Sequence, residues 1–327
     1  MSLLLIRNMT MNNSDFIQKT KRKIRSSFVS FGKKHLPYPI YAVANSKMVY
    51  HNGTGKELNY KKVADFNEKI FWLARYWQHP LIVKCADKIA VRDYVRDCGL
   101  DFLLNEILVV YSSADNISLD DLPDKFVLKC NHGCGFNIIC KDKSLLDITE
   151  VKVKVDKWLH TSIGIETAEY QYQHIQPCAY AERYIGDEED ERLEIQFFCF
   201  NGKARHILLR NDLGDAAKQS FAISYTRDWK RVKDRKREDM SIDIEKPENL
   251  DSMISYAERL ARPFPNVRVD FYLVGDRVYF GELTFSTSGN ILYNYNDKVL
   301  KEWGGELVLP EKIRTKWYKK YKIMNRR

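Results

Sequence analysis

The chain has 327 residues, of which 44% are hydrophobic and 13% aromatic, enough for two or three lobes with separate cores. Its net charge of +9 is concentrated at the ends, because residues 1–37 and 311–327 each contribute +7 and leave the body at −5. This composition excludes wholesale disorder and a nucleic-acid groove reader, and the apolar run at residues 3–6 is too short for a spanning helix.

The first 60 residues are basic and loosely patterned. Pro37 and Pro39 are expected to interrupt any helix there, because proline lacks the N–H that a helix interior needs. Apolar spacing then predicts a helix over residues 61–78 that ends before Pro80.

Asp87 is typical of a helix N-cap, and the apolar positions after it predict a second helix, which Gly99 ends. The pattern then changes to strands at residues 126–129 and 137–140, which flank a loop with two glycines at 131–135.

Residues 148–160 show both alternating valines and helical spacing. We interpret them as a helix, because Asp147 followed by Glu150 forms a capping-box pattern. Another strand is predicted at residues 180–185.

The last third of the chain predicts two hairpins around one helix. The first hairpin turns at Asn201-Gly202, a type I′ signal, and the second at Gly275-Asp276. The predicted strands are 194–200, 203–209, 267–274 and 277–285, and the helix between them runs from its cap at Asn249 to Pro263. Helices mixed with hairpins in this way predict an α+β fold.

The second hairpin carries the charged pattern with the most chemical information. Arg268 and Asp270 lie on one face of a strand, and Glu282 lies on the next strand. The opposite face is apolar, which favours the middle of a domain over a solvated edge, where the same residues would be only a charge ladder. Two carboxylates held together there need a cation between them, and their hard oxygen atoms suit Mg²⁺.

The turn constrains this hypothesis. A two-residue turn at Gly275-Asp276 would place Asp270 opposite Gly281 and direct Glu282 to the other face. Direct pairing of Asp270 with Glu282 therefore requires a three-residue loop or a β-bulge.

The loop from Lys129 to Gly135 can place backbone N–H groups and one cation around phosphates. Many strand–turn–strand units hold two glycines, so a plain connection stays an alternative. A zinc cluster is a further alternative, although the spacing differs from that of a zinc knuckle; its ligands would be Cys130, His132, Cys134 and Cys140.

Together, and in this order, these segments resemble the TupA-like ATP-grasp family, which is associated with teichuronopeptide and other cell-surface polysaccharide biosynthesis. The resemblance covers roughly residues 84–290. It rests on ADK at 86–88, FVLKCNHG at 126–133, AERYI at 181–185, FFCFNGK at 197–203, KPENL at 246–250, VRVDFY at 267–272 and GELTF at 281–285.

The resemblance implies an ATP-grasp fold, in which a central α+β nucleotide-binding lobe packs against a C-terminal mixed-sheet lobe. The implied divisions are a basic region at 1–60, an N-terminal lobe at 61–122, the central lobe at 123–190, the C-terminal lobe at 191–310 and a basic tail at 311–327.

The resemblance also implies ATP and Mg²⁺ as cofactors and assigns residues to them. Lys88 and Lys129 would contact the α- and β-phosphates, and residues 133–135 would cover the γ-phosphate. Adenine would bind at 182–185, where Glu182 accepts from its amino group, and Glu194 would hold the ribose. The implied nucleotide-binding residues are Lys88, Lys129, His132, Gly133, Gly135, Glu182, Arg183, Tyr184, Ile185 and Glu194.

Asp270 and Glu282 are the implied metal ligands, and Arg268 would steady the transferring phosphoryl group. The family's usual third ligand, an asparagine two residues after the glutamate, is replaced by Thr284. Thr284, Asn290 or water would therefore complete the metal site. The flap sequence Gly-Cys-Gly-Phe is also bulkier than the small-residue version expected of the family.

The implied reaction transfers the γ-phosphoryl group of ATP to a carboxylate and lets an amine attack the acylphosphate. The acceptor would be a uronic acid of a polysaccharide or its precursor, the amine would come from an amino acid, and Lys218 would be a further phosphate or carboxylate contact. A sugar or lipid kinase using the same nucleotide site stays an alternative, and a non-catalytic membrane-bound module would need a broken site.

Seven irregularly spaced cysteines and the absence of a signal-like segment predict a cytoplasmic protein. The basic ends suit an anionic surface such as the inner face of the cytoplasmic membrane, or serve only as solubilising tails. We expect no nucleic-acid partner.

Overall fold

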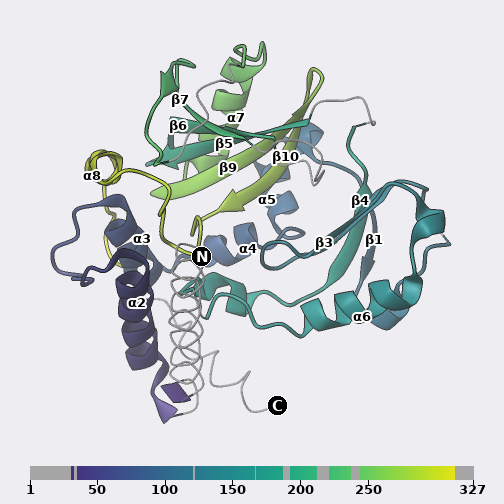
Figure 1. Cartoon of the computed structure of the whole chain (residues 1–327), viewed down its shortest axis with the longest axis horizontal. Coiled ribbons are helices and arrows are strands. Elements are labelled where there is room, and N and C mark those ends of the chain that lie inside the picture. Colours follow the sequence, from purple (N-terminus) through teal and green to yellow (C-terminus); the bar gives the residue numbers. More distant parts are fainter. Residues whose placement is uncertain are drawn as a thin grey trace, which may run out of the picture.

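Two antiparallel sheets, with helices on their outer faces and a helical region beside them, make up the molecule (Figure 1). The computed structural model describes residues 31–32, 35–120, 122–165, 167–186, 192–211, 221–236 and 244–313. The α+β class predicted from the sequence is confirmed.

Four α-helices come before the first strand of the described chain: α2 (Tyr38–Thr54), α3 (Phe66–Tyr76), α4 (Pro80–Ala86) and α5 (Val91–Asp97). The expectation that Pro37 and Pro39 interrupt a helix holds only in part. The backbone leaves the helical state at Leu36 and Pro37, but Pro37 is the N-cap of α2 and Pro39 lies in its first turn. The first turn of a helix has N–H groups without an intrahelical acceptor, so proline costs nothing there.

The helix predicted over 61–78 is shorter and is followed at once by another. Asp65 and Glu68 form a capping box at the start of α3, and Pro80 occupies the first turn of α4. Asp87 is not the N-cap expected of it, because α5 begins at Val91 after Ala90. Its Oδ1 instead accepts from the N–H groups of Ile89 at 2.8 Å and Ala90 at 3.2 Å, in the turn between α4 and α5.

The smaller sheet has four strands in the order β1-β4-β2-β3, all antiparallel. They are β1 (Ile107–Tyr111), β2 (Phe126–Cys130), β3 (Asn137–Cys140) and β4 (Ala179–Arg183). Helix α6 (Ile148–Leu159) packs against β2, and Asp147 caps it by accepting from the N–H groups of Thr149 and Glu150. Because β1 pairs with β4, the boundary expected at 122/123 would pass through this sheet.

The larger sheet has six strands in the order β10-β9-β5-β6-β7-β8. They are β5 (Arg192–Phe200), β6 (Lys203–Arg210), β7 (Ala222–Thr226), β8 (Arg231–Val232), β9 (Asn266–Val274) and β10 (Arg277–Thr284). Its named pairings are all antiparallel, so this sheet is not the mixed sheet that the family resemblance implies. Helix α7 (Leu250–Ala261) packs on β5, β6 and β9.

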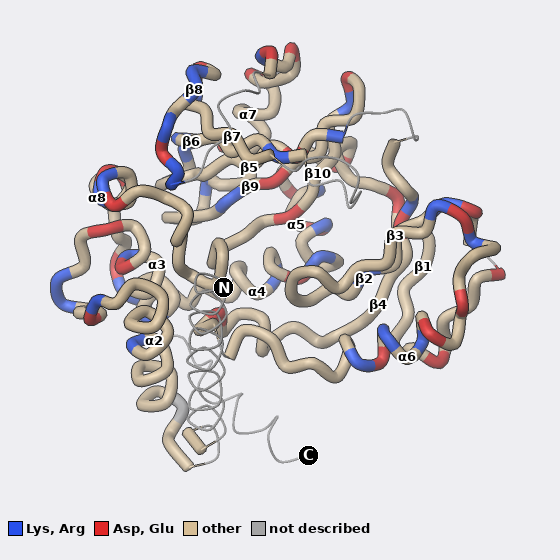
Figure 2. Tube along the Cα trace, in the orientation of Figure 1, with Lys and Arg blue, Asp and Glu red and all other residues tan. Residues whose placement is uncertain are grey.

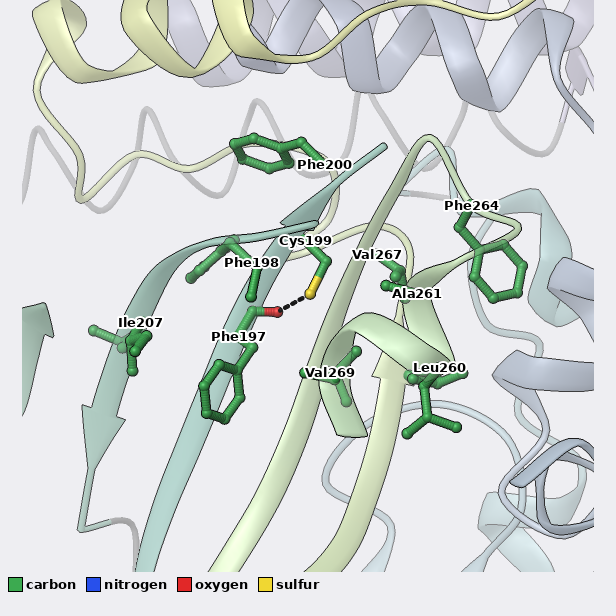
Figure 3. Packing of buried hydrophobic residues seen from close by; sticks show 14 of the residues in the cluster. Phe197, Phe198, Cys199, Phe200, Ile207, Leu260, Ala261, Phe264, Val267 and Val269 are labelled. Atoms are coloured by element: carbon green, nitrogen blue, oxygen red, sulfur yellow. Dashed lines mark hydrogen bonds between the residues drawn. The ribbon is translucent and has the colours of Figure 1, made fainter. Parts of the chain in front are cut away.

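The core of the larger lobe lies between this sheet and α7 (Figure 3). Phe197 of β5 and Val269 of β9 pair across the sheet, and both are fully buried with Leu260 of α7. Alternate residues of each strand therefore face this core. On the other face of β5, Phe198 and Phe200 pack against Trp303 of the helix at 297–306, and Glu194 and Gln196 are polar.

Helix α8 (Asp297–Glu306) returns the chain to the N-terminal helices, where it packs against α3. Lys69 donates to the carbonyl oxygen of Leu307 at 2.7 Å. The remaining elements are short 3₁₀ helices: η1 (Asp101–Leu103), η2 (Ala114–Asn116), η3 (Lys143–Leu145) and η4 (Tyr170–His174). Among the residues that the structure describes, no helix has the length and apolar character of a membrane span.

Candidate active site

Polar side chains cover the face of β9 and β10 that is turned away from α7. Asp270 pairs directly with Glu282 across the two strands, and Arg268 pairs with Thr284. Figure 2 shows acidic and basic positions side by side along these strands. The charged pattern found in the sequence is therefore one contiguous surface.

A β-bulge brings the two carboxylates to the same face. The turn at 275–276 has two residues, which alone would place Asp270 opposite Gly281. The register instead shifts between Phe280 and Glu282, so Gly281 is an extra residue in β10. A Cβ atom at this position would lie 2.9 Å from the carbonyl oxygen of Asp270, so only glycine fits without a shift. The bulge that the sequence argument required is confirmed.

Arg268 contacts both carboxylates. Its Nε donates to Asp270 Oδ1 at 2.7 Å, and its Nη2 donates to Oδ2 at 2.5 Å. Nη2 also lies 3.5 Å from Glu282 Oε1 and 3.2 Å from Thr284 Oγ1, and the Thr284 hydroxyl donates to Glu282 Oε1 at 2.8 Å. Through this shared nitrogen, Asp270 Oδ2 and Glu282 Oε1 lie within about 6 Å of each other. Carboxylates at such a separation can hold divalent cations together with substrate phosphates.

The two carboxylates differ in their electrostatic surroundings. Burial raises the pKa of Asp270 to about 7, with Glu282 adding to the effect and Arg268 opposing it. Burial would also raise the pKa of Glu282, but Lys88, Arg268 and Thr284 outweigh it and lower this pKa to about 2. A further positive charge nearby would therefore stabilise the ionised form of Asp270 more than that of Glu282.

The donor set fits Mg²⁺. Mg²⁺ in phosphate-binding sites commonly has one or two protein carboxylates and completes its shell with water and substrate phosphates. The described residues contain no group of three or more His, Cys, Asp or Glu arranged around a metal position. Asp270 and Glu282 thus offer the smaller ligand set, and their role as ligands stays a prediction.

Strand β5 continues the polar face. Gln196 and Glu194 pair with Asp270 and Tyr272 of β9. The Gln196 amide donates to Glu194 Oε1 at 2.8 Å and lies 3.5 Å from Asp270 Oδ2. Glu194, the predicted ribose contact, therefore shares a face and a hydrogen-bond chain with the predicted metal ligands.

Lys129 and Glu182 lie on one face of the smaller sheet. The register pairs Lys129 with Tyr180 and Val127 with Glu182, so the lysine and the glutamate are diagonal neighbours. Lys129 Nζ donates to Glu182 Oε1, and both side chains are largely buried. Two residues predicted to contact opposite ends of a nucleotide are thus paired with each other.

Lys88 links the two sheets. Its Nζ donates to the carbonyl oxygen of Gly133 at 2.6 Å and lies 3.4 Å from Glu282 Oε2. Its backbone N–H donates to the carbonyl oxygen of Asn131 at 3.0 Å. The loop predicted to cover phosphates therefore lies beside the predicted metal ligands, although the two are about 150 residues apart in the sequence.

The 131–135 loop is anchored at its base. Gly133 and Gly135 have φ values of +73° and +75°, a region that favours glycine. His132 is buried, and its Nε2 lies 3.2 Å from the carbonyl oxygen of Trp158 in α6. Burial lowers the pKa of His132, which favours its neutral form. His132 thus orders the loop, and its contact with nucleotide stays a prediction. The zinc alternative has no support, since the described residues contain no group of three or more His, Cys, Asp or Glu that could hold a metal ion.

Strand β4 ends sooner than predicted. It ends at Arg183, and Tyr184 and Ile185 follow it as half-buried residues. Arg183 points to the face opposite Glu182, where its Nε donates to Glu106 Oε2 at 2.7 Å in an exposed pair. The adenine contacts proposed for 183–185 stay predictions.

Asn290 is anchored through its amide nitrogen, whereas its Oδ1 is buried without a hydrogen-bond partner among the described residues, so its role as a metal ligand stays a prediction. Its amide donates to the carbonyl oxygens of Thr167 at 2.9 Å and Ala168 at 3.2 Å. It thereby ties the loop after β10 to the segment before η4, while Thr284 provides the hydroxyl that reaches Glu282. Lys218 lies outside the described residues.

Glu169 is a site residue that the sequence argument missed. It accepts from Ser286 Oγ and Thr167 Oγ1, both at 2.6 Å. Burial raises its pKa, the two hydroxyls oppose this, and the charge of Glu282 adds to it. No motif surrounds Glu169, because it lies in an irregular segment that only the tertiary fold brings to the site.

A comparison with family models matches residues 68–309 to the family described as TupA-like ATPgrasp. A comparison with curated proteins finds no match.

Several solved structures are similar to this chain. The D-alanine–D-alanine ligase from Bacillus anthracis complexed with ATP shares 17% identity at a TM-score of 0.38, over 62% of this chain and 55% of that one. The L-amino acid ligase from Bacillus licheniformis shares 12% identity at a TM-score of 0.44, over 71% and 53%. A D-cycloserine synthetase shares 14% identity at 0.39, over 70% and 72%. The match therefore spans little more than half the length of the two named ligases.

Proposed function

The chain belongs to the TupA-like ATP-grasp family, and from this premise we propose that it is an ATP-dependent ligase that joins a carboxylate to an amine. The products would be an amide, ADP and phosphate. The acceptor we propose is a uronic acid of a cell-surface polysaccharide or its precursor, and the amine is that of an amino acid.

The observation that carries the proposal is the convergence of cations on Glu282. Lys88 approaches its Oε2 from the segment before α5, and Arg268 approaches its Oε1 from β9. Asp270 stands beside them, and Lys129 lies on the neighbouring sheet. Cations that surround a buried Asp270 and a partly exposed Glu282 suit the transfer of a phosphoryl group, whose charge must be offset in the transition state.

In this mechanism, Lys88 and Lys129 bind the phosphates of ATP, and Arg268 offsets charge on the γ-phosphoryl group as it moves. A carboxylate oxygen of the acceptor forms the new bond to phosphorus, and the bond to the bridging β–γ oxygen breaks to release ADP. Asp270 and Glu282 would hold Mg²⁺, which when bound neutralises phosphate charge. The amine then attacks the acyl carbon, phosphate leaves, and the amine loses a proton.

The protein needs no covalent nucleophile for this reaction. Cys130, Cys140 and Cys199 are buried, and burial raises the pKa of each thiol. The 131–135 loop would exclude water from an acylphosphate, which would otherwise hydrolyse; its contact with Lys88, beside Glu282, supports this role.

A kinase would instead need a base that deprotonates a sugar hydroxyl. The described carboxylates of this site all have partners: Asp270 has Arg268, Glu282 has Lys88, Glu182 has Lys129, Glu194 has the Gln196 amide, and Glu169 has two hydroxyls. A carboxylate acceptor is already ionised at neutral pH and needs no such base. This favours the ligase over the kinase.

The test is ADP release measured over uronic acids paired with amino acids, with Asp270→Asn protein as the control for contaminating activity. We expect ADP only when both substrates are present, with one phosphate formed per ADP. A phosphorylated sugar that forms without an amine would establish the kinase instead.

A further inference from the structure

A cavity of about 150 Å³ lies on the same sheet, beside Arg268. Strands β5, β6 and β7 contribute to its lining, together with the loop at 287–295 and the segment around Arg235. Three of its lining residues are arginines, namely Arg210, Arg235 and Arg268, and none of the described lining residues is Asp or Glu. The cavity therefore favours an anionic occupant.

The backbone around Arg235 is fixed against the opposite wall. Lys236 N–H donates to the carbonyl oxygen of Asn294 at 2.7 Å, and Asn296 N–H donates to that of Asp234 at 2.9 Å. Arg235 and Tyr295 form an antiparallel bridge between these bonds. The position of Arg235 is therefore set by the fold itself and needs no ligand.

The guanidinium of Arg235 has unused donors. Its carbon lies 5.7 Å from the centre of the Tyr295 ring. Its Nε and Nη1 are buried and have no hydrogen-bond partner among the described residues. A buried donor without an acceptor is costly, and a carboxylate or phosphate is the acceptor that a guanidinium binds best.

Arg268 belongs to both the cavity and the phosphoryl-transfer site. It lines the cavity and also contacts Asp270 and Glu282. Arg235 lies over the Tyr295 ring, and Tyr295 and Arg268 line the same cavity. An occupant of the cavity would thus lie beside both Arg235 and Arg268, and Arg268 belongs to the reacting centre.

The rest of the lining suits a sugar ring. Tyr293 and Tyr295 offer aromatic rings, and Thr287, Ser288 and Asn294 offer hydroxyl and amide groups. Such a mixture of apolar faces and convergent polar groups is typical of small-molecule sites.

We propose that this cavity binds the acceptor of the ligase, a sugar acid with a second anionic group that Arg235 holds while the reacting carboxylate lies beside Arg268. The assignment rests on the proposed function. A phosphate on the sugar is the second group that best matches the Arg235 guanidinium, because it offers several acceptor oxygens.

The test is calorimetric titration of the protein with three probes: D-glucuronic acid, D-glucuronic acid 1-phosphate and inorganic phosphate. Each titration is run with and without a non-hydrolysable ATP analogue and Mg²⁺, so that nucleotide binding is measured separately from anion binding. The variants are Arg235→Gln and Arg235→Lys, with Arg205→Gln as the matched control. Arg205 lies on β6 and is exposed beside Glu306, outside the cavity.

We expect the sugar phosphate to bind about ten-fold more tightly than the plain sugar acid, because a charge-assisted contact is added. Arg235→Gln should remove this preference, Arg235→Lys should keep part of it, and Arg205→Gln should leave it unchanged. Melting temperatures near that of the wild type would show that the variants are folded.

Three results would overturn the proposal. They are equal binding of the two sugar acids, binding of none of the probes, and a preference for the sugar phosphate that survives in Arg235→Gln. Inorganic phosphate that binds as tightly as the sugar phosphate would assign the cavity to free phosphate and would also overturn it. Failure of nucleotide binding alone would contradict the proposed function, while anion binding that depends on Arg235 would still identify the cavity as a site.

Discussion

At the scale of single residues, the sequence predicted which charges would meet but not how they would pair. Arg268, Asp270 and Glu282 were found from strand alternation and from the apolar residues on the opposite face. The pairing of Lys129 with Glu182, and the contact of Lys88 with Glu282, depend on tertiary placement that no local pattern contains. Glu169 and Arg235 were missed for the same reason.

Lys129→Ala should weaken ATP binding by about ten-fold or more, since a charged contact to phosphate is lost. The matched control is Lys141→Ala, an exposed lysine just after β3 on the same sheet. Calorimetric titration with ATP and Mg²⁺ measures both. Equal affinities in the two variants would remove Lys129 from the nucleotide site.

Asp270→Asn should lower kcat by at least about 100-fold, because it removes a carboxylate that would hold the metal. The residue is buried and bound to Arg268, so the change should also cost about 1–3 kcal/mol of unfolding free energy. Turnover over a Mg²⁺ series, with urea unfolding in parallel, separates the two effects. Near-wild-type turnover in a folded variant would exclude the metal assignment.

At the scale of elements, the sequence predicted the two hairpins on either side of α7, and the pairing of Asp270 with Glu282 required the bulge in β10. The sequence did not predict β1, β7, β8, α2, α4 or α8. Strand β8 has only two residues, too few to form a pattern. Helix α2 has Pro37 and Pro39 at its start, and proline predicts a helix break unless its position in the first turn is known. Register and helix starts depend on neighbours, which explains these failures.

Gly281→Ala should destabilise the protein by about 1–3 kcal/mol and abolish most activity, because the added methyl group meets the Asp270 backbone and disturbs the bulge. Gly305→Ala in α8 is the matched control, since a Cβ there meets nothing within 4 Å. That control should be neutral or more stable by up to about 1 kcal/mol, because alanine favours a helix. Urea unfolding of both variants is the measurement, and equal stability would show that β10 tolerates a side chain at the bulge.

At the scale of the whole molecule, family resemblance predicted an ATP-grasp protein, and the match over residues 68–309 confirms it. The division into lobes was less accurate, because β1 joins the central sheet from the N-terminal side of the expected boundary. Most of the two basic ends lies outside the described residues, so their expected attraction to an anionic surface rests on charge alone.

Removal of residues 314–327 takes away seven basic residues. It should weaken sedimentation with anionic vesicles at low salt, and the difference should shrink as salt screens the charges over about 8 Å at physiological ionic strength. Equal sedimentation of both proteins at low salt would leave the tail as a solubilising segment.

The central claim is that the site activates a carboxylate as an acylphosphate. Hydroxylamine is a strong small nucleophile, so it should replace the amine and trap this intermediate. The measurement is mass spectrometry of a reaction containing ATP, Mg²⁺, a panel of uronic acids and hydroxylamine, with Asp270→Asn protein as the control. The account predicts a hydroxamate of one uronic acid, formed in equal amount with ADP. A sugar phosphate ester that forms at the same rate with or without hydroxylamine would contradict it.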